Sequence, residues 1–439
     1  MPKTDRYGLT LSTESSVAAE RYQGGMDDLL AYGPDADRAF ADARAADERF
    51  ALAHAGTALF VFLQGDGVAA REAIGRARDV AAGATRREQQ HVEALATVMA
   101  GDATRGLALI EEHLREFPRD ALLLNQASST IGFSGRGDRE QARADFVERL
   151  APAYGDDWWY QSALAFTYHE LGRYAESQRL SELSLAQYPR NANASHNIAH
   201  VYFEAADNDG GAAFLEDWLR DYDRRAPFHC HLAWHLALFE LHRGRAERAY
   251  EIAERDVVRS ASARLSMIDG AAILWRFSLY GAPAGPFPWA PLAELASRVS
   301  RPGFVFGDVH AALAYASTGD AEGLARLVDG LRGLEAKGHP CAGTVALPLV
   351  LGTQAFVAGD HAGALAHFEP VEKEMHRVGG SHAQWELFEE TMVVSYLKLG
   401  RQKDAERLLR RRIAHRPSPR DLVWLGESGA APKVEVTRG

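Results

Sequence analysis

Residues 158–189 read WWYQSALAFTYHELGRYAESQRLSELSLAQYP. The first half predicts one helix, which Gly172 and Arg173 interrupt, and the second half predicts another, which Pro189 ends. Glycine commonly closes a helix because it adopts left-handed backbone angles, and proline cannot continue one. The stretch therefore predicts two antiparallel helices joined by a short turn.

The turn glycine of this unit recurs along the whole chain. The intervals run from 34 to 41 residues, and glycine is usually followed by aspartate or arginine. Repetition at this period is typical of stacked helical units that share their cores with their neighbours. The sequence therefore predicts a solenoid. The marker glycines are Gly65, Gly101, Gly137, Gly172, Gly210, Gly244, Gly281, Gly319, Gly359 and Gly400.

Other residues keep a fixed distance from these glycines. Pro118, Pro189 and Pro417 each follow a marker glycine by 17 residues, and a small residue such as Ser177 or Ala405 follows by five. A small residue there lets two helices approach closely. This pattern resembles the tetratricopeptide repeat. The resemblance implies an all-α, right-handed superhelix of about ten to eleven helix-turn-helix repeats.

Composition supports the same fold class. The chain has 439 residues, 46% hydrophobic residues and a formal net charge of −11. We expect one continuous array over residues 1–427 with no convincing strand, and a disordered tail over 428–439. The proline-rich segment 280–291, YGAPAGPFPWAP, cannot form a regular helix, and we expect a structured loop or lid there.

The same data exclude several classes of protein. The acidic charge opposes nucleic-acid binding, which needs a dense basic surface. No apolar stretch is long enough to span a bilayer, and the first residues lack a signal core, so we expect a cytoplasmic protein without a membrane partner. Cys230 and Cys341 should both stay reduced. The sequence leaves a homodimer through the terminal helices open.

Two histidine pairs stand out in the repeat register. His196 and His200 are four residues apart, as are His231 and His235, so each pair lies on one face of a helix. The pairs are offset by 35 residues, which is one repeat. Equivalent positions in neighbouring units therefore present four imidazoles to one another, with the helix axes about 8–10 Å apart.

Further histidines follow the same register. His91 lies three repeats before His196, and His54 and His310 precede their turn glycines by eleven and nine residues. In tetratricopeptide arrays this face of the first helix lines the concave groove that binds ligands, so the resemblance implies a groove lined by imidazoles. Neutral imidazole is a transition-metal ligand and a general base. The two pairs could bind zinc, iron or copper, with His169, Glu170, Glu204 and Asp308 as additional ligands or orienting groups.

Simpler interpretations exist for the same residues. A histidine on a buried helix face is often only a polar core residue, and no HExxH, CxxC or GxSxG motif occurs. Cys230 lies beside two histidines in sequence, but neighbours on a helix point in different directions. Trp234 lies between the two histidines of its helix and is the aromatic residue that we assign to the groove.

A closer resemblance covers residues 9 to 415. The segments TRREQQHVEAL (85–95), SHNIAH (195–200), HLAWHLALF (231–239), FGDVH (306–310), LPL (347–349) and RVGGSHAQ (377–384) resemble those of the tetratricopeptide repeat protein 38 family. The resemblance implies a fold and a pocket rather than a reaction. The residues at matching positions are His54, His91, His196, His200, His231, Trp234, His235, Asp308 and His310, with Gly379, Gly380, Ser381, Ala383 and Gln384 in a GGS loop.

Two functions remain open from the sequence. The first is a helical-repeat binding protein that holds a small molecule or peptide in its histidine-lined groove. The second is an enzyme that uses His196, His200, His231 and His235 as metal ligands or acid–base groups on a small, anionic substrate, with the backbone N–H groups of residues 379–384 against the anion. An open groove favours the first function, and a closed one favours the second.

Overall fold

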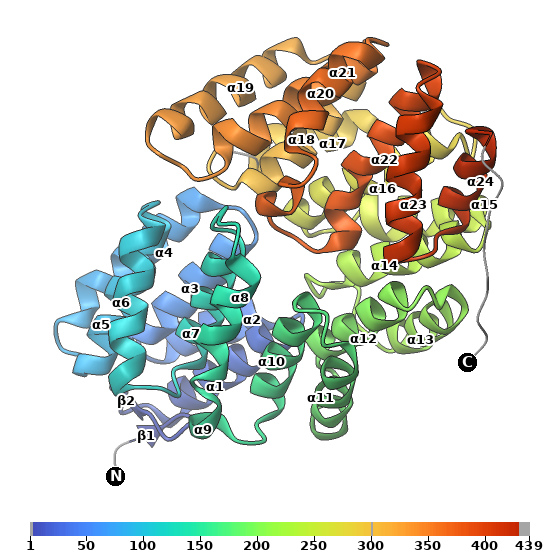
Figure 1. The fold of residues 1–439 in the computed structure, drawn as a ribbon. Helices are drawn as coiled ribbons and strands as arrows, with labels where there is room; N and C mark the ends of the chain where they lie inside the picture. Colours follow the sequence, from blue (N-terminus) through green and yellow to red (C-terminus); the bar gives the residue numbers. More distant parts are fainter. Residues whose placement is uncertain (1–2, 300–301, 430–439) are drawn as a thin grey trace.

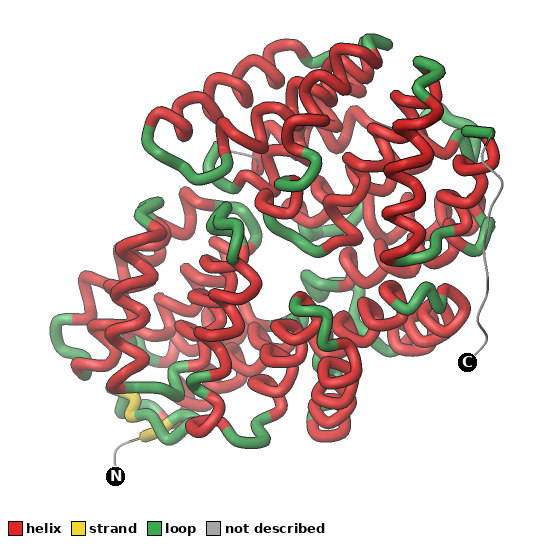
Figure 2. Tube along the Cα trace, viewed as in Figure 1, coloured by secondary structure: helices red, strands yellow, loops and turns green. Residues whose placement is uncertain are grey.

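The structure is a computed structural model that describes residues 3–299 and 302–429, most of them helical (Figures 1 and 2). Successive helices pack as antiparallel pairs, so the all-α helical-repeat superhelix predicted from the glycine spacing is confirmed. The helices of the first half are α1 (Ser16–Ala31), α2 (Ala36–Ala46), α3 (Ala51–Leu63), α4 (Gly67–Ala81), α5 (Arg86–Met99), α6 (Ala103–Glu116), α7 (Ala121–Gly132), α8 (Arg139–Glu148), α9 (Ala151–Tyr154), α10 (Trp158–Glu170), α11 (Tyr174–Gln187) and α12 (Ala192–Glu204).

The second half continues the pairs with less regular helices between them. Its α-helices are α13 (Asn208–Arg220), α14 (His229–His242), α15 (Ala246–Ile252), α16 (Ala263–Tyr280), α17 (Trp289–Val299), α18 (Val305–Thr318), α19 (Ala321–Ala336), α20 (Leu347–Val357), α21 (His361–Phe368), α22 (His382–Lys398), α23 (Gln402–His415) and α24 (Pro419–Glu427). Two π-helical stretches, η1 (Ala253–Val258) and η2 (Ala342–Ala346), and two 3-10 turns, η3 (Glu369–Val371) and η4 (Met375–Val378), lie among them.

The Gly-Asp pairs explain the repeat. Gly65 and Gly101 have φ of 95° and 93°, which glycine adopts without steric cost, so each ends a first helix. The aspartate that follows caps the second helix: the Asp66 side chain accepts the N–H of Ala69. The same pair of roles recurs at Gly319 with Asp320 and at Gly359 with Asp360.

Two marker glycines do not occupy the left-handed turn position. Gly210 lies inside α13, and the left-handed residue of that turn is Ala206, with φ of 56°. In the fourth unit Gly135, with φ of 76°, takes the position that the spacing predicts for Gly137. The period predicted how many turns there are better than it predicted which residue takes the left-handed position in each turn. Any of several neighbouring residues can occupy that position.

The chain begins with a short hairpin that the sequence did not predict. β1 (Lys3–Thr4) pairs antiparallel with β2 (Thr10–Leu11), with Lys3 opposite Leu11 and Thr4 opposite Thr10. The expectation that the chain has no strand is therefore wrong for these residues. Strands of two residues are too short to show the alternating pattern that identifies a strand in a sequence.

The superhelix curves until its fourth unit, α7 with α8, touches the segments before α18 and α22. In Figure 1 the N-terminal helices α1–α8 lie beside the C-terminal ones. Arg139 donates to the Gly380 carbonyl at 2.9 Å, and Arg377 donates to the Gly135 carbonyl at 3.0 Å. The Phe133 ring lies 5.0 Å from that of Phe304. We call these contacts the closure contacts. They close one side of the concave groove that the repeat fold predicts.

The proline-rich segment is a structured loop, but it is not placed as a lid. α16 continues to Tyr280 and α17 begins at Trp289, so only the residues between them are irregular. The Phe287 ring packs 5.8 Å from Phe277 of α16 and 5.9 Å from Tyr250 of α15. This apolar packing holds the loop against α15 and α16.

At the C-terminal end, Ser428 is buried and its hydroxyl donates to the Leu425 carbonyl at 2.7 Å. The predicted disordered tail therefore begins later than residue 428, and its remaining part, 430–439, lies outside the described residues. Within the described ranges, no helix combines the length and hydrophobicity that crossing a membrane requires. Cys230 and Cys341 are both free and buried.

A buried ion network joins the last helices to one another. The guanidinium group of Arg412, on α23, contacts Glu389 at 2.9 Å and Asp421 at 3.0 Å, and its side chain is 4% exposed. Burial raises the pKa of the Asp421 carboxyl, although Arg412 opposes this. Removing one partner of a buried ion pair leaves the other charge without compensation.

We expect Arg412→Met to lower the free energy of unfolding by about 3–5 kcal/mol, because Glu389 and Asp421 lose their buried cation. Guanidinium denaturation followed by circular dichroism measures the change. Arg410→Met is the control, since Arg410 lies on the same helix, is 46% exposed and pairs only with Glu406 among its recorded ion pairs. Equal effects of the two substitutions would contradict the structural role of the network.

Candidate metal centre

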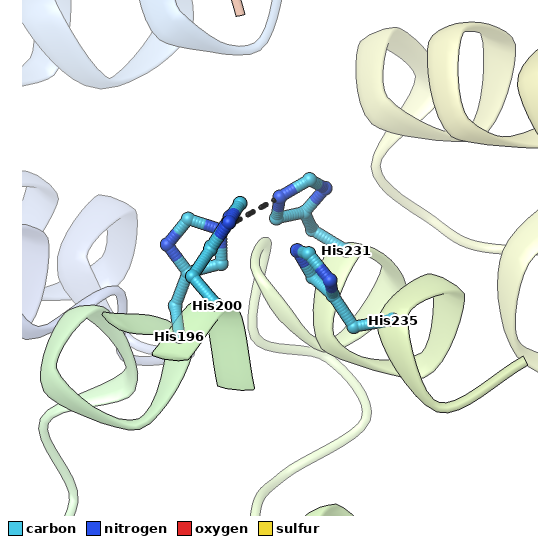
Figure 3. A group of neighbouring side chains, drawn as sticks. All are labelled: His196, His200, His231 and His235. Carbon is cyan, nitrogen blue, oxygen red and sulfur yellow. Dashed lines mark hydrogen bonds between the residues drawn. The ribbon is translucent and has the colours of Figure 1, made fainter. Parts of the chain in front are cut away.

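Four histidines from two neighbouring first helices converge on one point (Figure 3). His196 and His200 come from α12, and His231 and His235 come from α14. The Nε2 atom of His196 lies 2.8 Å from Nε2 of His200 and 3.0 Å from Nε2 of His231. One nitrogen from each of the four rings lies within 4.8 Å of all the others. The spacing of 35 residues thus predicted this juxtaposition, and we call the group the four-histidine cluster.

The cluster lies in the interior of the protein. His200 and His235 are fully buried, and His196 and His231 are at most 5% exposed. Burial lowers the pKa of His196, His200 and His235 well below the ordinary imidazole value, and neighbouring imidazoles lower it further. These three rings are therefore neutral at physiological pH, which is the form that binds metals.

Hydrogen bonds among the rings cannot satisfy them. A neutral ring nitrogen has either one hydrogen or one lone pair, but Nε2 of His196 faces two other Nε2 atoms. Both ring nitrogens of His235 and the Nδ1 atoms of His196 and His200 have no hydrogen-bond partner. Buried polar atoms normally have partners. A cation bound among the Nε2 atoms would give those nitrogens a shared partner, but it would not reach the Nδ1 atoms of His196 and His200.

An aspartate orients one of the rings. Asp269, on α16, is fully buried, and its Oδ2 accepts from Nδ1 of His231 at 2.8 Å. This contact orients the His231 ring with Nε2 directed into the cluster, and in a neutral ring it places the hydrogen on Nδ1. A carboxylate behind a ligating imidazole is a common feature of metal sites. The Trp234 ring stacks on the His231 ring, with 5.4 Å between the two ring centroids, and so packs against the face of the imidazole.

The dimensions of the cluster fit a metal ion. Zinc binds imidazole nitrogen at about 2.0–2.1 Å, which places the nitrogens of a tetrahedral site about 3.3 Å apart. The closest pairs here are 2.8 and 3.0 Å apart, and the widest separation is within 4.8 Å. Four protein ligands would leave no open position for a substrate.

A cavity of about 420 Å³ lies beside the cluster. His169 lines the cavity, and its ring centroid is 4.6 Å from that of His200, so it lies between the cavity and the cluster. None of the four cluster histidines and none of residues 280–291 lines it. The lining residues are Glu140, His169, Glu170, Tyr174, Glu204, His376, His382, Trp385, Glu389, Arg411, Arg412 and His415.

Three residues named as additional groups line this cavity: His169, Glu170 and Glu204. Two further lining residues, His382 and His415, were not predicted as site residues: Nδ1 of His382 lies 3.3 Å and Nε2 of His415 lies 3.4 Å from the Glu204 carboxylate. His382 lies inside the GGS-loop segment, but no register connects it with α12, 178 residues earlier. Only the closing of the superhelix brings these residues together.

His54 and His91 lie on first helices, α3 and α5, as predicted, but they have partners of their own. His54 hydrogen-bonds through Nε2 to the Glu48 carbonyl at 2.9 Å. His91 contacts Asp120 at 3.0 Å, inside a buried network with Arg87. Neither belongs to a metal-ligating group among the described residues, so they do not join the four histidines of α12 and α14.

Asp308 and His310 lie on α18 and are buried. His310 contacts the Phe306 carbonyl through Nδ1 at 2.8 Å, and burial lowers its pKa to about 4. Asp308 accepts the Gly303 N–H at 3.2 Å. Neither residue is in a metal-ligating group of the described chain.

The GGS loop has a structural use. Ser381 and Gln384 form a capping box at the start of α22, and Oε1 of Gln384 accepts the Ser381 N–H at 3.1 Å. The Gly379 N–H is bonded to the His376 carbonyl. These two N–H groups are therefore not available for an anion. Cys230 is fully buried, which raises its pKa well above the ordinary thiol value and makes it a poor nucleophile.

The antiparallel helix pairs, the left-handed turns and the capping aspartates identify this chain as a helical-repeat protein of tetratricopeptide-like fold. No family model matches it. A solved human IFIT1 dimer with m7Gppp-AAAA has 14% identity and a TM-score of 0.42, covering 95% of this chain and 87% of the other. The APC/C hetero-tetramer Cut9-Hcn1 has 11% identity and a TM-score of 0.38, covering 87% and 78%. Likenesses of this size add nothing to what the helix pairs establish.

The lowered imidazole pKa values predict how metal-free protein responds to acid. A group with a lower pKa in the folded state binds fewer protons than in the unfolded chain, so stability falls as pH drops below the unfolded value near 6.5. With three such imidazoles, we expect a loss of up to about 4 kcal/mol per pH unit. Urea denaturation of metal-free protein between pH 8 and pH 5 measures this.

A matched pair of variants assigns that slope. His200→Gln/His235→Gln removes two of the imidazoles and should flatten the pH dependence. His361→Gln/His367→Gln, on α21, leaves the cluster intact and should keep most of it. A slope that is unchanged by the first variant would show that other groups govern the acid response.

Proposed function

We propose that this protein is a helical-repeat binding protein that holds a transition-metal ion among His196, His200, His231 and His235. The observation that carries the proposal is the convergence of four buried ligand nitrogens within 4.8 Å. Imidazole is a ligand for zinc, copper and iron, so these are the candidate ions. Asp269 supports a metal role, because it directs Nε2 of His231 to the shared point.

The adjoining cavity is the proposed ligand site. Its volume of about 420 Å³ lies in the range of small-molecule pockets, and the closure contacts leave less room for a peptide than an open groove would. Its lining has four glutamates and two arginines. This excess of carboxylates favours a neutral or cationic small molecule over the anionic substrate that we expected from the sequence.

An enzyme is the second candidate, because the closure contacts close one side of the groove. His169 lines the cavity, is 4% exposed, and has an Nε2 atom without a partner. Such a group could exchange a proton with a bound small molecule. A metal bound by all four cluster histidines would be saturated and structural, so the acid–base groups would come from the cavity.

The proposal includes the closer family resemblance. All four residues of the cluster, and Trp234 beside them, are among the positions that resemble the tetratricopeptide repeat protein 38 family. Ligand binding by His54, His91, Asp308, His310, Ser381 and Gln384 stays a prediction of that resemblance.

The test is the metal content of untagged protein, measured by elemental mass spectrometry. We expect His196→Ala/His235→Ala to lose about one equivalent of zinc, iron or copper, because it removes two of the four ligands. His361→Ala/His367→Ala should retain it. Wild-type protein whose metal content equals that of the His196→Ala/His235→Ala variant would refute the metal centre and leave the cavity as a metal-free ligand site.

A further inference from the structure

A second group of metal-ligating side chains lies in the cavity itself. Glu204 of α12, His382 of α22 and His415 of α23 each offer one ligand atom, and these atoms lie within 4.8 Å of one another. The Glu204 carboxylate is 3.3 Å from Nδ1 of His382 and 3.4 Å from Nε2 of His415. All three residues line the cavity. This group is separate from the four-histidine cluster and shares no residue with it.

We propose that Glu204, His382 and His415 form a second metal site, which binds a divalent transition-metal ion and has open coordination positions toward the cavity. Two imidazoles and one carboxylate are the ligand set of zinc hydrolase sites and of non-haem iron sites, both of which keep positions for water or substrate. The proposal does not depend on a metal in the four-histidine cluster.

The charge of Glu204 supports the proposal. Its side chain is 3% exposed, and its two recorded ion-pair partners are the imidazoles of His382 and His415. A buried carboxylate needs a compensating positive charge. Either an imidazolium or a metal ion can supply it, and these alternatives lead to different outcomes in the experiment below.

A second carboxylate lies near His382. Oε2 of Glu386, one turn further along α22, lies 3.7 Å from Nε2 of His382, while Nδ1 faces Glu204. Glu386 is itself 1% exposed and held by Arg416 at 2.8 Å. The contact with His382 is an ion-pair contact, longer than the 2.8 Å hydrogen bond between Asp269 and His231.

The arginines of the cavity do not oppose a cation. Arg411 pairs with Glu372 and with Glu389, the latter at 2.6 Å. Arg412 pairs with Glu389 and Asp421. Their charges are therefore compensated on the side of the last helices. On the opposite wall Glu140 pairs with Arg139 at 2.6 Å and Glu170 pairs with Arg143 at 3.5 Å, so these charges are compensated as well.

His169 is an independent indication of a ligand in this cavity. Its ring is buried, it lines the cavity, and its Nε2 atom has no partner. A polar atom in that position normally meets a partner that the protein itself does not supply. A water molecule or small molecule bound at an open position of the metal would be such a partner.

The experiment is a zinc titration of metal-depleted, untagged protein by equilibrium dialysis, with bound metal counted by elemental mass spectrometry. The proposal predicts one equivalent more for wild type than for Glu204→Gln/His382→Gln. His376→Gln is the matched control, because His376 lines the same cavity but belongs to neither ligand group. Circular dichroism checks that each variant is folded.

The two metal sites can fail separately. The His196→Gln/His235→Gln variant should still bind one equivalent of zinc, at the second site. Adding Glu204→Gln to this variant should remove that equivalent. Equal zinc binding by wild type and Glu204→Gln/His382→Gln would overturn the second site and identify the group as an ion pair with imidazolium. If both double variants fail to fold, His415→Gln is the substitute, since His415 is 54% exposed. Its unchanged zinc content would also overturn the proposal.

Discussion

The turn between the two helices of each unit is the constraint on which the rest of the structure depends. Where the turn is Gly-Asp, a left-handed glycine ends the first helix and the aspartate caps the second. Ala206 after α12 and Gly244 after α14 take the same left-handed position, so the reversal again needs only a few residues. Short reversals hold successive first helices side by side at nearly constant register. Because α12 and α14 are neighbours in this register, two histidine pairs on separate helices meet face to face.

Bringing four imidazoles together in a dry interior has an electrostatic cost. Each additional positive ring would oppose the others at short range, so the folded protein keeps His196, His200 and His235 neutral. Neutral rings in turn leave unpaired nitrogens. The four-histidine cluster is therefore neither a fully hydrogen-bonded core nor a charged network, and this is the physical basis of the metal site proposed above.

The sequence was most informative where interactions follow the repeat. The helix pairs and the meeting of His196 with His231 could be predicted, because both depend on spacing along a regular array. Asp269, which orients His231, was not predicted, since a single buried aspartate carries no pattern. Glu204 and His382 meet across 178 residues through the curvature of the whole superhelix, which accumulates from small rotations that no local motif records. The segment 280–291 was expected to be a structured loop or lid, because its prolines exclude a regular helix. Where the loop lies depends on the packing of Phe287, which the proline pattern does not predict.

The closure contacts have a consequence for how the cavity responds to changes elsewhere in the chain. The cavity is lined on one side by α8, α10 and α12 and on the other by residues 376–415, so the two arginine–carbonyl pairs between residues 135–139 and 377–380 join its walls. The partners in these two pairs are 241 and 242 residues apart in the sequence. A change in the twist of any unit between them would therefore alter the cavity, because a chain joined at two such points cannot take up the change at a free end.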